Sequence, residues 1–192
     1  MISSKVVLPA LMAGFLATSS ATATIVVSFD PPTQTVGTGD VFTVDIVASI
    51  PENDATIGWG LDFDIADLLL VTQTATPPVI GPSWDAAGTL DGDGLAGLAP
   101  TPPGTGIWDA NNPILLATIE LQADLINEGV TALLLSDNNP ADLTEGFALE
   151  PPPAGVFANV TYEPGEVTVI PEPTTLTLLA LVTVSIAGRR RR

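Results

Sequence analysis

The sequence predicts an all-β protein whose body is a single antiparallel β-sandwich. Apolar and polar residues alternate in several segments, as they do in strands with one buried face. No segment shows the 3.6-residue period of a convincing amphipathic helix, and Gly and Pro separate the alternating segments. About eight or nine short strands without such a helix are typical of a β-sandwich.

The first strands are expected at residues 24–29 and 41–48. In the second of these, one face is apolar and consists of Phe42, Val44, Ile46 and Ala48. Residues 57–65 alternate most regularly and predict one continuous strand. Its odd positions are expected to face the core and its even positions the solvent; the odd residues are Ile57, Trp59, Leu61, Phe63 and Ile65.

Further strands are expected at residues 68–72, 115–123, 130–135, 156–162 and 166–170. In the second of these, the residues predicted to face the core are Ala117, Ile119, Leu121 and Ala123. Residues 76–113 contain seven Pro and seven Gly and show no convincing strand. We therefore expect one sandwich domain, residues 24–168, with one long loop that is either functional or poorly ordered.

The first 23 residues have the composition of a secretory signal peptide. Lys5 precedes an apolar run, and Ala21 and Ala23 occupy the small-residue positions that signal peptidase accepts. We expect cleavage before Thr24 and export of the mature chain. The alternative is a buried N-terminal helix.

The C-terminal end combines three features in a fixed order. The motif Pro171-Glu172-Pro173 precedes an expected apolar helix at residues 174–188, and the chain ends in Arg189, Arg190, Arg191 and Arg192. A helix of that length spans only about 22 Å, short of the ~30 Å hydrocarbon core, so it must thin the bilayer or extend its polar ends. The arginines predict a cytoplasmic C-terminus. The alternative is a plain tail anchor.

Residues 169–192 resemble the PEP-CTERM sorting signal of Gram-negative bacteria in motif, short apolar span and arginine cluster. The resemblance implies recognition by an exosortase, a membrane-embedded cysteine transpeptidase-like enzyme, and removal of the tail near the motif. It also implies a transient inner-membrane anchor, a mature form at the cell surface or outside the cell, and an association with biofilm and exopolysaccharide.

The body resembles the cohesin-like β-sandwich of the carbohydrate-binding-module superfamily. The resemblance rests on Gly37-Thr38-Gly39-Asp40 before the strand at 41–49, on residues 59–65 followed by Asp67, and on late strands at 114–123 and 129–135. The corner at 63–68 lacks the Tyr of the family. The resemblance implies a jelly-roll-type sandwich and leaves the ligand open.

The distribution of charge excludes several classes of function. The chain has 22 acidic and five basic residues, a net charge of −17, and the bases are Lys5 and the four C-terminal arginines. Residues 24–173 therefore hold all 22 acids and no base, so this stretch has a formal charge of −22. Such a body cannot neutralise phosphates, so it does not bind nucleic acid. Without Cys or His it has no disulfide, no Cys/His zinc site and no Ser-His or Cys-His nucleophile.

An enzyme is also disfavoured, because no pair of acids stands out as the two carboxylates of a glycosidase. Asp62 and Asp64, two positions apart on one strand face, are expected to be solvated. No basic side chain is present to depress the pKa of a catalytic acid.

Calcium is the one cofactor that the sequence suggests. Asp91-Gly92-Asp93-Gly94 resembles half of a calcium loop, but Pro102 stands where an EF-hand needs a bidentate Glu. The remaining ligands would then be distant acids such as Asp85 or Asp109. The alternative is an ordinary Asp-Gly turn.

Two of the three tryptophans lie in the long loop. Trp84 and Trp108 each precede an Asp, a pairing that suits stacking on a sugar ring, whereas Trp59 is expected in the core. The alternative is that both loop tryptophans cover the sandwich and fix the loop.

Taken together, these features predict an exported envelope protein that signal peptidase and an exosortase process. Its expected role is structural or adhesive, in an extracellular matrix, with extracellular polysaccharide as the candidate ligand. The alternative is a calcium- or carbohydrate-binding module without a matrix role.

Overall fold

The computed structural model describes residues 24–100, 105–138, 145–150 and 157–172. These residues form fourteen strands and one short 3-10 helix, η1 (Glu52–Asp54). The strands are β1 (Ile25–Asp30), β2 (Thr33–Gly37), β3 (Val41–Ile50), β4 (Thr56–Gly60), β5 (Asp62–Ile65), β6 (Val71–Gln73), β7 (Val79–Ile80), β8 (Asp85–Ala86), β9 (Ala96–Leu98), β10 (Asp109–Ala123), β11 (Gly129–Ser136), β12 (Gly146–Leu149), β13 (Val160–Tyr162) and β14 (Gly165–Ile170).

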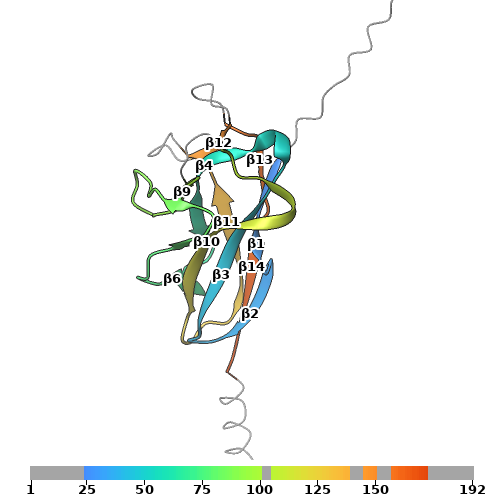
Figure 1. The fold of residues 1–192 in the computed structure, drawn as a ribbon. Helices are drawn as coiled ribbons and strands as arrows, with labels where there is room; N and C mark the ends of the chain where they lie inside the picture. The colour runs from blue at the N-terminus through green and yellow to red at the C-terminus, as the bar shows by residue number, and fades with distance from the viewer. Residues whose placement is uncertain (1–23, 101–104, 139–144, 151–156, 173–192) are drawn as a thin grey trace, which may run out of the picture.

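The strands assemble into three sheets (Figure 1). Sheet A has the order β13-β1-β3-β10-β6, with β7 also paired to β10. Sheet B has the order β2-β14-β11-β5, and sheet C the order β12-β4-β9-β8. The all-β sandwich predicted from the sequence is thus confirmed.

Two strand pairs depart from a purely antiparallel pattern. β13 runs parallel to β1 at one edge of sheet A, and β14 runs parallel to β2 in sheet B. In both cases a strand from the end of the chain lies beside a strand from its beginning. The last strands therefore close the fold against the first.

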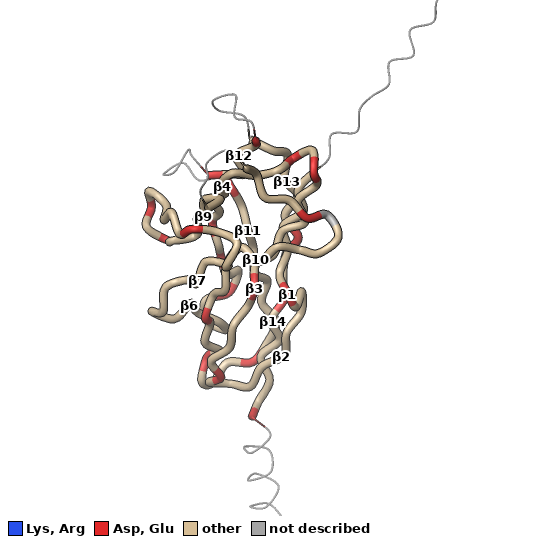
Figure 2. Tube along the Cα trace, in the orientation of Figure 1, with Lys and Arg blue, Asp and Glu red and all other residues tan. Residues whose placement is uncertain are grey.

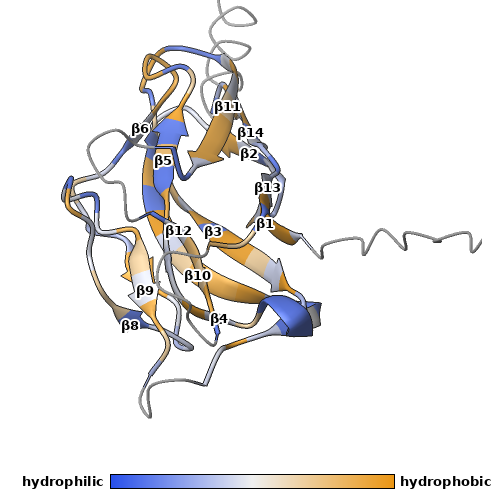
Figure 3. Cartoon of the chain, turned by 90° about the horizontal axis from the view of Figure 1, so that it is seen from above, coloured by the Kyte–Doolittle hydropathy of each residue, from blue (hydrophilic) through white to orange (hydrophobic). Residues whose placement is uncertain are grey.

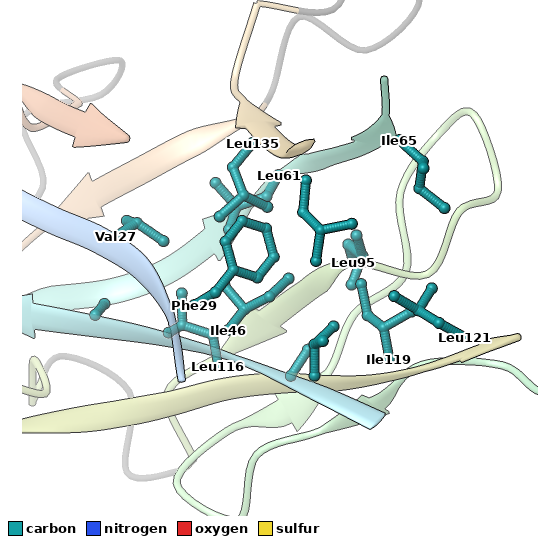
Figure 4. Close-up of a cluster of buried hydrophobic side chains, with 14 of the residues drawn as sticks. Val27, Phe29, Ile46, Leu61, Ile65, Leu95, Leu116, Ile119, Leu121 and Leu135 are labelled. Atoms are coloured by element: carbon teal, nitrogen blue, oxygen red, sulfur yellow. The ribbon is translucent and has the colours of Figure 1, made fainter. Parts of the chain in front are cut away.

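Sheets A and B pack face to face over a core of aliphatic and aromatic side chains (Figure 4). Phe29 on β1 meets Phe63 on β5 edge to face, with ring centroids 6.1 Å apart. The predicted inward residues of β3 and β10 are buried, apart from the partly buried Phe42. The alternation in β3, and in β10 from Ala117 onward, produces this outcome, because successive side chains point to opposite faces of a sheet. Leu116 is also buried, next to Ala117, where the register of β10 shifts.

The predicted single strand at 57–65 is wrong in its continuity. Leu61 separates β4, in sheet C, from β5, in sheet B, so the chain passes from one sheet to the other. Gly58 and Gly60, expected in solvent, are buried, and Ile57 is only partly buried. Side chains from the neighbouring segments lie over both glycines: a Cβ on Gly58 would be 2.9 Å from Leu98 Cδ2, and a Cβ on Gly60 would be 3.3 Å from Cγ of Glu145.

The predicted long loop at 76–113 contains regular structure. β7, β8 and β9 lie within it, and β10 begins at Asp109, before its end. Gly97 on β9 shows how tightly the segment packs, since a Cβ there would lie 2.7 Å from Trp59 Nε1 and 2.9 Å from the Cβ of Trp84. These strands are two or three residues long, too short for alternation to show in the sequence.

Most of the predictions for the two ends of the chain concern residues outside the described ranges. These are the signal peptide with Ala21 and Ala23, Pro173, the apolar segment 174–188 and the four arginines. In the part of the chain that the structure describes, no helix has the length and apolar character needed to cross a membrane.

Candidate functional site

Four carboxylates from three separate segments gather at the end of sheet C next to sheet B. Asp62 is the first residue of β5, Asp91 and Asp93 lie between β8 and β9, and Glu145 directly precedes β12. One oxygen of each lies within 4.8 Å of the others. We refer to these four residues as the carboxylate cluster.

Pairing around Gly60 at the end of β4 brings the cluster together. Gly60 is paired with Gly146 of β12 on one side and with Ala96 of β9 on the other. The next residue, Leu61, donates its N–H to the Leu95 carbonyl at 3.0 Å. A Cβ on Gly60 would lie 3.3 Å from Cγ of Glu145, so the absence of a side chain lets Glu145 pass close to the strand.

The loop that holds Asp91 and Asp93 depends on two glycines. Gly92 and Gly94 have φ of 85° and 77°, in the left-handed region that favours glycine. Asp93 Oδ1 accepts the N–H of Leu95 at 2.9 Å. Thr89 Oγ1 lies 2.5 Å from Asp93 Oδ1 and also contacts Asp91 Oδ1, yet its single proton can satisfy only one of them at a time.

The electrostatics of the cluster favour a cation. Glu145 is only 7% exposed, and at a separation of 4.8 Å two carboxylates repel by about 3–4 kcal/mol at an effective dielectric constant of ~20. The sequence has no basic residue between 24 and 173 to offset this repulsion, and Figure 2 shows acids throughout the described chain. A cation bound between the four carboxylates would relieve this repulsion.

The geometry of the cluster fits a calcium ion. Calcium binds six to eight oxygens at about 2.3–2.6 Å, so ligands on opposite sides of one ion are at most about 5 Å apart. The four oxygens meet this limit, and bidentate carboxylates and water can complete the shell. Asp62, Asp91, Asp93 and Glu145 are therefore the residues that could hold the metal.

The sequence identified half of this cluster. It pointed to Asp91 and Asp93 but proposed Asp85 or Asp109 as the distant ligands, and neither belongs to the cluster. Asp109 instead caps its own turn, and the N–H groups of Asn112 and Asn111 hold its pKa below the ordinary value. The distant acids are Asp62, which was expected to be merely solvated, and Glu145.

A hollow of about 270 Å³ adjoins the cluster at Glu145. Its wall combines glycine backbone with the side chains of Trp59, Leu98 and Phe157. Leu98 and Phe157 are 54% and 43% exposed, so the hollow has an apolar rim.

The two candidate sugar-stacking tryptophans differ. Trp84 is buried, with 6% exposure, and packs edge to face on Trp59 at 6.2 Å, so its ring has no face open to a ligand. That candidate is wrong because the segment around it folds into sheet C. Trp108 is 48% exposed, and its role in stacking on a sugar ring stays a prediction.

The Pro-Glu-Pro motif begins directly where the fold ends. Ile170, the last residue of β14, is paired with Gly37 of β2, and its carbonyl accepts the N–H of Thr38 at 2.9 Å. Pro171 and Glu172 follow with no intervening linker. A Cβ on Gly37 would lie 3.5 Å from Cγ of Glu172, so this side chain lies against the turn after β2.

Residues 169–192 match the family model of the PEP-CTERM protein-sorting motif, which confirms the resemblance noted for this segment. No curated protein sequence is detectably similar to the chain. An exported protein that is anchored at its C-terminus before processing is consistent with this motif.

Solved cohesin modules share the fold of the body. The sixth cohesin of scaffoldin B from Acetivibrio cellulolyticus, solved with a mutant dockerin, has a TM-score of 0.52 and 12% identity, covering 77% of this chain and 98% of that one. A non-cellulosomal cohesin from the archaeon Archaeoglobus fulgidus has a TM-score of 0.49 and 13% identity, covering 82% and 97%. The first of these shows a cohesin-type β-sandwich, as the resemblance of the body implied.

Proposed function

We propose that the chain is an exported surface or matrix protein whose β-sandwich is a calcium-dependent, non-enzymatic binding module. An exosortase releases it from a transient membrane anchor. The carboxylate cluster carries the proposal for the body, since four acids within one coordination shell lie in a domain without a single base. The sorting motif supports the proposal for the route to the surface.

The proposed ligand is an extracellular polysaccharide, bound in a structural or adhesive role. A calcium ion at the cluster would expose a Lewis-acidic centre beside the hollow lined by Trp59, Leu98 and Phe157. Vicinal hydroxyls of a sugar can complete a calcium shell, while an apolar rim covers a sugar face. The acidic surface favours a neutral polymer over an anionic one, because like charges repel.

A second candidate is a protein partner. The Acetivibrio cellulolyticus cohesin with the same fold was solved bound to a dockerin. Exposed apolar side chains on the described surface would suit such a partner, and a module of this kind needs no matrix role.

Binding of polysaccharide is tested with the secreted protein on an array of neutral and anionic glycans, with calcium and with chelator. We expect retention on neutral glycans that calcium increases at least about tenfold. Asp91→Asn with Asp93→Asn should remove the calcium-dependent part, and Asp85→Asn with Asp109→Asn, which removes the same charge outside the cluster, should not. Glycan binding that calcium does not change, or the absence of binding to any glycan, would favour the protein partner.

Processing at both ends leaves a distinctive product. Mature protein should have lost Lys5 and all four arginines, so trypsin should find no cleavage site in it. Mass spectrometry of the secreted form checks this expectation directly. Pro171→Ala with Pro173→Ala should leave the protein in the membrane fraction, whereas Pro77→Ala with Pro78→Ala should not. Intact Arg192 on the secreted form would contradict processing.

A further inference from the structure

Two loops share a pattern that leaves aliphatic side chains in solvent. In each, an Asp precedes two aliphatic residues: Asp67-Leu68-Leu69 and Asp124-Leu125-Ile126. Asp67 Oδ1 accepts the N–H of Leu69 at 2.9 Å, and Asp124 Oδ1 accepts the N–H of Ile126 at 2.9 Å. Each carboxylate therefore closes an Asx-turn in its own loop, a common role of Asp in turns.

The four aliphatic side chains are strongly exposed. Leu68, Leu69, Leu125 and Ile126, which we call the docking residues, are 63%, 73%, 74% and 82% exposed. Their loops are joined, because Asn127 Nδ2 donates to the Leu69 carbonyl at 3.2 Å and the Asp124 N–H to the Leu70 carbonyl at 2.8 Å. Adjacent exposed aliphatic residues of this kind mark an interaction surface.

The docking residues lie at the end of the sandwich where the described chain stops. The turn after β2 bridges the two features: Thr38 donates to the Ile170 carbonyl at 2.9 Å, and Gly39 donates to the Asp124 carbonyl at 2.9 Å. A Cβ on Gly39 would lie 3.0 Å from Leu125 Cδ2. Figure 3 shows orange, hydrophobic segments in the loops beside β6 and β11 at this end.

The length of chain beyond the fold limits how far away a membrane can be. Only residues 171–175 separate Ile170 from the apolar run that starts at Leu176. Five extended residues span at most about 18 Å. If the apolar run lies in a bilayer, the bilayer surface is within that distance of β14.

We propose that the docking residues contact the bilayer surface while the sorting segment anchors the chain. This inference rests on the anchoring part of the proposed function. Leucine and isoleucine side chains at a loop tip enter the boundary between headgroups and acyl chains. The acids near them in the chain are Asp67, Asp124 and Glu128, and the Asp40 carbonyl accepts the N–H of Ala123 at 2.9 Å. Because these charges are negative, the suitable lipid is zwitterionic.

Such docking positions the body for processing. Sheet B would stand on the membrane with the end of β14 facing it, and the Pro-Glu-Pro motif would lie at the membrane surface. A membrane-embedded enzyme reaches its cleavage site there. Once the tail is removed, four aliphatic side chains alone hold the body only weakly, so the product leaves the membrane.

The natural chain has no cysteine, which permits a direct test. The full chain carrying Ile126→Cys with an environment-sensitive fluorophore is reconstituted in phosphatidylcholine vesicles that contain a nitroxide-labelled lipid. The control is Leu90→Cys, which is 77% exposed and lies in the β8–β9 loop near the carboxylate cluster. We expect the fluorophore at 126 to be quenched at least about threefold more than that at 90.

Two further measurements distinguish a failure of the proposed bilayer contact from a failure of the membrane anchor itself. Leu68→Ser with Leu69→Ser should lower quenching at 126 at least about twofold while the chain still sediments with vesicles, whereas Leu98→Ser should change neither. Sedimentation with equal, weak quenching at both positions overturns the docking and leaves the anchor intact. A chain that does not sediment with the vesicles overturns both.

Discussion

Calcium at a hundredfold excess over its dissociation constant is expected to raise the melting temperature of the protein by about 5–10 °C, because a ligand bound only by the native state stabilises by mass action. The carboxylate cluster is the expected site, since its four oxygens lie within 4.8 Å of one another. Magnesium at equal concentration should have a smaller effect, because it needs shorter bonds and strict octahedral geometry. Differential scanning fluorimetry in both ions measures the difference.

The double variant Asp91→Asn with Asp93→Asn should differ from the natural protein in melting temperature, and calcium should reverse the sign of that difference. Without the ion, the variant removes repulsion within the cluster and should melt above the natural protein. With calcium it lacks two ligands and should melt below it. Asp85→Asn with Asp109→Asn removes equal charge elsewhere and should keep the full calcium increment. If calcium and magnesium raise the melting temperature equally, and the first variant shows the same increases, the Asp91–Asp93 loop is an ordinary turn without a role in calcium binding.

Phe147→Ala is expected to lower the free energy of unfolding by about 3–5 kcal/mol, the usual cost of removing a buried Phe. Phe147 is fully buried on β12, where it is paired with Trp59 of β4, and its carbonyl accepts the N–H of Ala158 at 2.8 Å. A loss of this size lowers the melting temperature by roughly 10 °C or more in a domain of this length. Urea unfolding followed by tryptophan fluorescence measures the free energy.

Phe157→Ala is the matched control. Phe157 lies next to the same strand, bridged to Ala148, but is 43% exposed, so its truncation creates less cavity and should cost clearly less. Similar losses in both variants would mean that β12 does not anchor sheet C. The calcium increment of Phe147→Ala should also fall, because Glu145 directly precedes this strand.

Alternation predicted those strands that have one buried face and one solvated face. β3 and β10 are of this kind, and their inward residues could be assigned from the sequence. The same rule failed at residues 57–65, because the chain changes sheets at Leu61 while the alternation continues across the break. It also missed β2 and β12: β2 consists mostly of Thr and Gln, with only Val36 as a large apolar residue, and β12 has only four residues.

Prediction of the candidate site from the sequence was limited for a different reason. A short motif identifies ligands that are neighbours along the chain, as Asp91 and Asp93 are. Asp62 and Glu145 reach the cluster only because Gly60 is paired with both β9 and β12, and that pairing has no signal in a single sequence. Glycine at positions 58 and 60, between apolar residues, was the one hint that strands pass close to this segment.

The position of β14 determines how the molecule responds to pulling. A protein held by its C-terminus is loaded along β14, which is bonded on one side to β2 and on the other to β11. Force directed along a strand loads the rungs of both ladders in shear, so many hydrogen bonds must break together and not one after another. The described chain begins at the opposite end of the sandwich (Figure 1), so tension between its two ends runs along the length of the sheets. The arrangement of β14 is thus suited to bear tensile load during the stage before processing, while the sorting motif would anchor the chain.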